Sequence, residues 1–237
     1  MLIYADLHIH SCLSPCADMD MTPMNICAMA KIKGLQVISV TDHNSAANLP
    51  AADQAARKHG LLLLPGIEIT TREEVHLLAY FPTVDQALAM GDFLYSHLPN
   101  IQTNSRIFGQ QCIMGDDDKV IRLESRLLIS AVDISLRPMV EEIEKLGGFA
   151  IPAHINRGGN GLLVNLGLMP DDIHFPAVEV SKDLPIPYNL LEGKVVLHSS
   201  DAHQLGAILE QEFTMDISDL SPTGILSVLG YHRLKLF

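Results

Sequence analysis

The sequence predicts an α/β fold in which strands and helices alternate around a parallel sheet or barrel. Short apolar runs typical of buried strands alternate with segments of helical period. Several helical segments begin at a proline and end at a glycine, which is the asymmetry that helix ends favour. The length of 237 residues also suits a single α/β barrel.

The first part of the chain repeats a strand followed by a helix. Residues 2–7 form the first expected strand, and the next helix has Thr22 as its cap, Pro23 at its first position and Gly34 after its end. The elements expected next are a strand at 36–40, a helix at about 49–59 ending at Gly60, strands near 61–64 and 75–80, and a helix at about 83–97.

The alternation weakens between residues 99 and 135. Two short strands are expected within 110–124, joined by an acidic turn of Gly115 and three aspartates that we interpret as solvated. We expect 99–135 to be an inserted lid or wall within a single domain spanning 1–237. The elements expected after it are a helix at about 136–146, strands at 149–153, 177–181 and 195–199, and a last helix that begins at Ser221 and Pro222.

Composition and charge narrow the function classes. Sixteen Lys and Arg against 28 Asp and Glu give a formal net charge of −12, which argues against duplex nucleic acid and anionic membranes as partners. A small anionic substrate remains compatible with local cations. No apolar run reaches the roughly 18 to 20 residues of a membrane span, no signal peptide is recognised, and four cysteines suit a reducing compartment. We therefore expect a cytoplasmic protein, and the sequence indicates no oligomeric state.

Histidines and carboxylates gather at the ends of the expected strands. His8 and His10 stand two positions apart, so their side chains point the same way, about 6.6 Å apart along the strand. Such a pair alone can equally be two packed or surface histidines. Further strands, however, carry His43, Glu68, His76, His154, Asp201 and His203 at or near one end. In alternating α/β folds these ends converge, and the set suits two or three divalent ions of Zn, Mn or Fe, with Glu68 as a bridge.

The ordered motifs 6-DLHIHS-11, 41-TDHN-44, 66-GIE-68 with His76, 153-AH-154 and 200-SDAH-203 resemble those of the PHP family, the polymerase and histidinol phosphatase domains. The resemblance runs from residue 4 to about 206. It implies a distorted (β/α)7 TIM-like barrel, a two- or three-metal site and phosphoester hydrolysis. The implied ligands are His8, His10, Glu68 and Asp201 for one ion, Glu68, His76 and His154 for a second, and His43 with His203 for a third.

The third implied site departs from the family pattern. Family members usually offer an Asp or His seven or eight positions after the first ligand histidine, where this chain has Pro15 and Cys16. Cys16 would be a soft ligand that favours zinc, whereas Asp18 would reach the site only from a locally longer loop. The third alternative is a weak or empty site.

Three further residues are candidates for direct roles in catalysis. Arg157 follows His154 by three positions and is a candidate phosphate clamp, with a solvated loop arginine as the alternative. Arg72 is a second candidate, although neighbouring glutamates offer it local pairs. Asp42 precedes His43 and is expected to orient an imidazole or to protonate the leaving oxygen.

These observations predict a metal-dependent phosphoesterase, in which a metal-bridging hydroxide attacks a small phosphorylated metabolite or nucleotide. A phosphatase acting on monoesters is the favoured form. The alternative is an exonuclease or oligonucleotide phosphodiesterase, which the lack of tryptophan and the net charge do not favour. A non-catalytic metal-binding module is a third alternative, against which the size of the ligand set argues.

Overall fold

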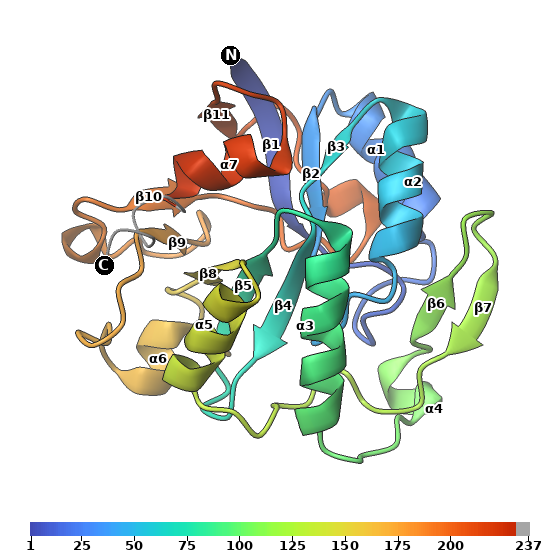
Figure 1. Ribbon diagram of the computed structural model, residues 1–237, viewed down its shortest axis with the longest axis horizontal. Helices are drawn as coiled ribbons and strands as arrows, with labels where there is room; N and C mark the ends of the chain where they lie inside the picture. Colours follow the sequence, from blue (N-terminus) through green and yellow to red (C-terminus); the bar gives the residue numbers. More distant parts are fainter. Residues whose placement is uncertain (231–237) are drawn as a thin grey trace.

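The computed structural model describes residues 1–230 and has a mixed α/β fold (Figure 1). Its strands are β1 (Leu2–Ile9), β2 (Val37–Val40), β3 (Leu62–Leu63), β4 (Gly66–Thr70), β5 (His76–Tyr80), β6 (Cys112–Met114), β7 (Val120–Leu123), β8 (Phe149–Pro152), β9 (Ala177–Glu179), β10 (Val195–Leu197) and β11 (Thr214–Asp216). Its helices are α1 (Pro23–Ile32), α2 (Leu49–His59), α3 (Val84–His97), α4 (Ser105–Phe108), α5 (Leu136–Lys145), α6 (Leu162–Leu166) and α7 (Pro222–Leu229), with 3-10 turns at Tyr188–Leu190 and Leu205–Ala207. The expected α/β class is confirmed.

The strands form four hydrogen-bonded sheets, ordered β11-β1-β2-β3, β4-β5-β8, β10-β9 and β6-β7. A few backbone hydrogen bonds connect three of these sheets near the strand ends: Asn44 N–H donates to Glu68 O, Ile155 N–H to Glu179 O, and His10 N–H to Ala202 O, among others. Closure into a seven-stranded barrel stays a prediction.

The direction of β5 explains how a residue at the start of a strand joins residues at the ends of others. β5 runs antiparallel to both β4 and β8, with His76 opposite Thr70 at the end of β4. Ala153 N–H, just after β8, donates to the backbone oxygen of His76. His76 therefore lies beside the residues that follow β8, although it begins its own strand.

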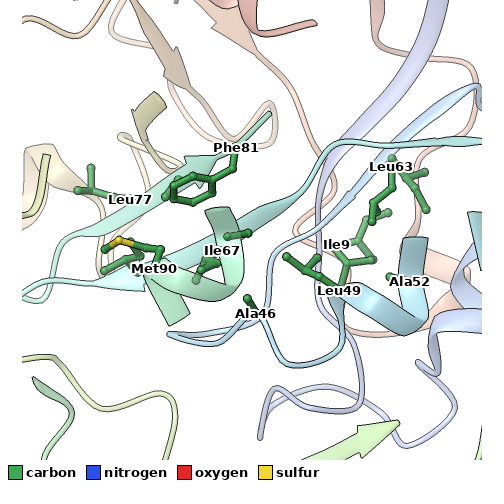
Figure 2. Packing of buried hydrophobic residues seen from close by; sticks show 14 of the residues in the cluster. Ile9, Ala46, Leu49, Ala52, Leu63, Ile67, Leu77, Phe81 and Met90 are labelled. Carbon is green, nitrogen blue, oxygen red and sulfur yellow. The ribbon is translucent and has the colours of Figure 1, made fainter. Parts of the chain in front are cut away.

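The hydrophobic core lies on both faces of the strands. Leu77 and Ala79 of β5 belong to a large cluster under the helices, whereas Leu78 and Tyr80 face a smaller cluster on the other side. Figure 2 shows part of the large cluster, where side chains from the strands meet those of α2 and α3. Strands that are buried on both faces have sequences that are apolar almost throughout, and several strands of this chain have such sequences.

Gly66 allows β4 to approach its neighbours closely. A Cβ atom at this position would lie 2.6 Å from Ser39 Oγ and 2.8 Å from Thr41 Cγ2. These distances are shorter than non-bonded atoms tolerate, so the side-chain-free residue lets β4 bring Glu68 next to the end of β2.

The inserted element 99–135 contains α4, β6 and β7, and the β6-β7 hairpin projects from the side of the molecule near α2 (Figure 1). The acidic turn is more than a solvated turn, because the Asp118 carboxylate accepts hydrogen bonds from Thr22 Oγ–H and Met24 N–H at the start of α1. These hydrogen bonds therefore connect the β6-β7 hairpin to the start of α1. Within residues 1–230, no helix is long and apolar enough to cross a membrane.

Candidate metal centre

His8, His10, Glu68 and Asp201 bring their donor atoms together at one end of the strands. His8 Nε2 lies 3.3 Å from both Glu68 Oε1 and Asp201 Oδ1. His10 Nε2 lies 3.2 Å from the same Asp201 oxygen and 3.3 Å from Glu68 Oε2. The four donor atoms are close enough to share one metal ion.

Both oxygens of the Glu68 carboxylate also lie close to three other histidines. Glu68 Oε1 lies 2.7 Å from His76 Nδ1 and 3.2 Å from His154 Nε2, while Oε2 lies 3.0 Å from His43 Nδ1. His43, Glu68 and His76 form a further group whose donor atoms lie close together. Glu68 is buried and lies between the two groups of histidines, and its role as a bridge between ions stays a prediction.

His43 and His203 meet next to Cys16. The group His10, His43 and His203 has donor atoms close enough for a metal ion, and His203 Nε2 lies 3.1 Å from Cys16 Sγ. Cys16 also lines the pocket above the cluster. Asp18 does not: its side chain is exposed, and it contacts His203 through its backbone N–H, which donates to the histidine carbonyl. The expectation that Asp18 reaches the site through its carboxylate is not met, because the loop turns that side chain outward.

Glu179 orients two histidines and was missed by the sequence interpretation. Its carboxylate lies 3.1 Å and 3.2 Å from His8 Nδ1 and accepts a 2.9 Å hydrogen bond from His154 N–H. His8 Nδ1–H therefore donates to Glu179, which leaves Nε2 free to face Glu68 and Asp201. A glutamate inside the apolar strand 177–181 was the available signal, because a buried carboxylate requires partners.

Asp42 orients His10 through Ser14. Ser14 Oγ–H donates to Asp42 Oδ1 at 2.7 Å, so the same hydroxyl accepts from His10 Nδ1–H at 2.9 Å. Asp42 also accepts hydrogen bonds from the Ser11 N–H and hydroxyl. With three donors on its oxygens, Asp42 acts on the imidazole through the serine, which agrees with the orienting role and leaves it poorly placed to give up a proton.

Two residues of the cluster have strained backbones. His154 has φ of 27° and Asp201 has φ of 51°, the left-handed region that non-glycine residues seldom adopt. Such conformations cost roughly 1–3 kcal/mol and persist only where the surroundings impose them. Glu179, which holds the His154 N–H, is one of those surroundings.

The pKa values of the cluster residues shift in different directions, and some of these residues are in the metal-binding form at pH 7 while others are not. Although burial favours the neutral acid, the surrounding histidines hold the pKa of Glu68 well below its usual value. Burial lowers the pKa of His43 to about 3 and that of His203 to about 4, so both rings are neutral at pH 7. Burial opposes charge on His10 as well, but the Asp201 and Glu68 carboxylates close to its Nε2 outweigh that effect and raise the pKa to about 9.

Buried polar atoms without partners test whether divalent ions fit the residues present. Glu68 Oε2, Asp201 Oδ1 and His43 Nδ1 are buried and make no hydrogen bond. Leaving such atoms unpaired is costly, and all three point into the cluster from the groups above. Imidazole and carboxylate donors suit Zn, Mn or Fe, so the residues fit the two or three divalent ions that the sequence predicts.

The two arginine candidates have different positions. Arg157 lines the pocket above the cluster and pairs with Asp201 through its guanidinium. Arg72 lies outside that pocket: its Nε donates to Asp133 Oδ1 at 2.9 Å and its side chain is 56% exposed. The prediction that Arg72 binds the phosphate is therefore wrong. Arg72 instead forms an ion pair at the surface, and its partner is Asp133 and not one of the neighbouring glutamates.

Two cavities meet at the cluster. A cavity of about 230 Å³ lies over the histidines and is lined by Cys16, His76 and Asp201, among others. Of residues 99–135, Ile129 contributes to its lining, and the role of this segment as an inserted lid or wall stays a prediction. A larger cavity of about 580 Å³ shares His154, Arg157 and Asp201 with the first.

Fold and site together define the class of metal-dependent hydrolases, with a buried His/Glu/Asp cluster at the strand ends of an α/β domain. The PHP domain model matches residues 6–129, just over half of the chain, and the chain belongs to the PHP domain family. The expected family is confirmed.

Two curated relatives are nucleases. The chain is 31% identical over 112 residues to the 5'-3' exoribonuclease Rnm of Salmonella typhimurium, which covers 45% of this chain and 36% of the relative. It is 35% identical over 69 residues to a 5'-3' exoribonuclease of Haemophilus influenzae, and this alignment covers 29% of this chain and 24% of the relative. The chain thus aligns with about a third or less of each relative's length.

Solved structures show the same fold at low identity. A lesion-specific endonuclease from Pyrococcus furiosus matches with a TM-score of 0.70 and 20% identity, covering 97% of this chain and 56% of the other. A metal-dependent phosphoesterase from Bifidobacterium adolescentis matches with a TM-score of 0.61 and 20% identity, covering 96% of both chains.

The expected exclusion of duplex nucleic acid is wrong. Endonuclease Q, whose fold matches with a TM-score of 0.67, 20% identity and coverage of 95% of this chain and 55% of the other, was solved with a 27-mer duplex substrate at its active site. A formal net charge of −12 averages over the whole surface, whereas nucleic acid responds to the local field at a site.

Proposed function

We propose that the protein hydrolyses phosphoesters at a two- or three-metal centre built around Glu68. The observation that carries this proposal is the set of buried donor atoms, including Glu68 Oε2 and Asp201 Oδ1, that face one another without hydrogen-bond partners. A purely structural metal site is satisfied by four ligands. This cluster is larger and opens into a cavity, as a catalytic site must.

The proposed ligands form three sets on a distorted (β/α)7 barrel. The first set is His8, His10, Glu68 and Asp201; the second is Glu68, His76 and His154; the third is His43 and His203 with Cys16. Divalent ions bound there would supply a water activated at neutral pH and would neutralise charge on the phosphoryl oxygens. The thiol of Cys16 favours zinc in the third set.

The other residues of the site bind and orient. Glu179 and the Asp42–Ser14 pair fix the ring orientations of His8 and His10, so that the Nε2 atoms face inward. Arg157 lines the cavity over the cluster, where its guanidinium can exchange Asp201 for a phosphoryl oxygen of the substrate. Each of these contacts positions charge before the substrate arrives.

The proposed substrate is a small phosphorylated metabolite or nucleotide. A second candidate is the end of an oligonucleotide, favoured by the two curated relatives named as 5'-3' exoribonucleases. In the first case the enzyme is a phosphatase, in the second a phosphodiesterase.

Metal analysis combined with substrate screening tests the proposal. Purified protein loaded separately with Zn²⁺, Mn²⁺ or Fe²⁺ is assayed on sugar phosphates, mononucleotides, 3',5'-bisphosphonucleosides and 5'-phosphorylated oligonucleotides. We expect two or three bound ions per chain and hydrolysis of at least one class. Absence of hydrolysis in every metal-loaded sample would refute the proposed activity.

A further inference from the structure

The larger cavity has no role in the function proposed so far. Its volume of about 580 Å³ exceeds that of the cavity over the histidines, about 230 Å³. Both are lined by His154, Arg157 and Asp201, so they adjoin at the proposed metal centre. A group bound in the larger cavity is therefore next to the place where phosphorus would react.

Two segments form much of the wall of the larger cavity, 180–184 after β9 and 206–210, which begins within the second 3-10 turn. Ser181, Ser199 and Asp183 contribute hydroxyl and carboxylate groups. The ammonium groups in the wall are already paired: Lys33 lies 3.3 Å from Glu210, and Lys182 pairs with Glu212. The wall thus offers hydrogen bonds without a surplus of positive charge.

Among the described lining residues, His154 and Arg157 at the metal centre offer the ring or guanidinium plane on which a nucleobase could stack, and the rest of the wall offers none. Among the described lining residues there is no Phe, Tyr or Trp, and the apolar ones are aliphatic, such as Val180 and Ile208. Hydroxyl and carboxylate groups beside aliphatic side chains suit a polyhydroxylated group such as a ribose or another sugar. A second phosphate would meet the paired glutamates at the rim and is not favoured.

A phosphodiester carries two organic substituents, and a phosphomonoester carries one. We propose that the protein, on the basis of the phosphoesterase function above, acts on phosphodiesters, with the sugar of the leaving group bound in the 580 Å³ cavity and the other substituent over the histidines. Water adds its oxygen to phosphorus, the P–O bond to the leaving sugar breaks, and a proton from that water ends on the leaving oxygen. The products are a phosphomonoester and an alcohol.

Filling the cavity from a wall that carries no proposed ligand tests this inference. Ala207 is exposed and lines the cavity, so Ala207→Trp would occupy it without replacing a site residue. Leu168→Trp is the matched control, because Leu168 is 61% exposed and lies outside that lining. Uridylyl-uridine serves as the diester, p-nitrophenyl phosphate as the monoester, and the uncleavable dinucleoside methylphosphonate as a binding probe.

We expect Ala207→Trp to raise the KM for uridylyl-uridine and the Kd of the methylphosphonate by about tenfold or more, while hydrolysis of p-nitrophenyl phosphate changes by less than about twofold. Leu184→Trp, on the opposite segment of the wall, should act in the same way if Ala207→Trp fails to fold. Unchanged diester binding in a folded, metal-replete variant, or an equal loss with both substrates, would overturn the inference. If the wild-type protein hydrolyses p-nitrophenyl phosphate or another monoester but not uridylyl-uridine, the inference fails while the proposed function stands; if it hydrolyses no substrate of the whole screen, the proposed function itself fails.

Discussion

Glu68 lies within 3.3 Å of ring nitrogens from five histidines, namely His8, His10, His43, His76 and His154. It comes from the middle of β4, where the neighbours of the chain are apolar and buried. No other described carboxylate lies so close to so many proposed ligands. A carboxylate in this place holds two sets of ligands in one geometry, so its loss should affect both.

Glu68→Gln should therefore lower metal content by at least one ion per chain and reduce the catalytic rate by more than about 100-fold, because even residues that only support a ligand cost 10- to 100-fold. Metal analysis after gel filtration, together with an assay on the best substrate, measures both effects. Glu192→Gln, a change at an exposed position, is the control. Full metal content in Glu68→Gln would contradict the bridging role.

Glu179 should act on metal affinity without touching a metal ion. Glu179→Gln removes the negative charge and one of the two acceptor oxygens that serve His8 Nδ1–H and His154 N–H. We expect metal binding to weaken by about 10- to 100-fold, measured by competition with a chromophoric chelator. Glu179→Asp should recover part of the affinity, because it restores the charge at a shorter reach. Equal affinities in all three proteins would show that Glu179 is only structural.

The proposed ligands could be found from the sequence because most of them stand next to or within an apolar run, where spacing and residue type are visible. His43 and Asp201 are examples of this pattern. The predictions for Arg72 and Asp18 failed because loops decide where these two side chains point. The Arg72 side chain, for example, contacts Asp133, which lies 61 residues away along the chain. Glu179 was overlooked because its partners also come from other strands. Local patterns thus identify residue types, while long-range contacts decide what each residue does.

At the level of elements, the β6-β7 hairpin and α1 depend on each other. The Asp118 carboxylate accepts hydrogen bonds from Thr22 and Met24 at the first turn of α1, across 96 and 94 positions of sequence. The α1 helix has no acidic residue of its own in that turn, so Asp118 supplies the negative charge that a helix N-terminus favours.

Asp118→Gly tests this contact, because Asp118 has φ of 61° and glycine adopts that conformation without strain. We expect the free energy of unfolding to fall by about 1 kcal/mol, the usual cost of a lost N-terminal cap. Asp117→Gly is the matched control: Asp117 pairs with Lys119 at the surface, where an ion pair contributes little. Urea denaturation measures the difference between the two variants. Equal midpoints would contradict the capping role.

Most elements could be predicted from the sequence, but the direction of β5 could not. The apolar run 75–80 indicates a strand whichever way it pairs. Its antiparallel register with β4 follows from the short turn between Thr70 and His76, which leaves no room for a crossover helix. The expected strand 61–64 likewise appears as the two-residue β3, because Pro65 separates it from β4.

At the scale of the whole molecule, metal binding and proton binding compete for the same place. In the metal-free protein, His10 donates Nδ1–H to Ser14, and its Nε2 lies 3.2 Å from Asp201 Oδ1 and 3.3 Å from Glu68 Oε2. These carboxylates raise the pKa of His10 to about 9 against the effect of burial. At pH 7 a proton therefore occupies Nε2, where the first ligand set would direct its lone pair to an ion.

Binding of Mn²⁺ should consequently release a proton and become tighter as the pH rises. Below pH 9 the proton on His10 must leave before Nε2 can bind. Against the effect of burial, Glu179, Asp201 and Glu68 also raise the pKa of His8, the other histidine of this set, well above its usual value. The apparent affinity should therefore increase by about tenfold or more per pH unit between pH 7 and 9. Calorimetric titration at pH 7 in two buffers of different ionisation enthalpy measures the release, which we expect to be one to two protons per ion bound at this set. His174→Gln, at an exposed position, should release the same number. Identical heats in both buffers would contradict the competition, because a released proton must be taken up by the buffer.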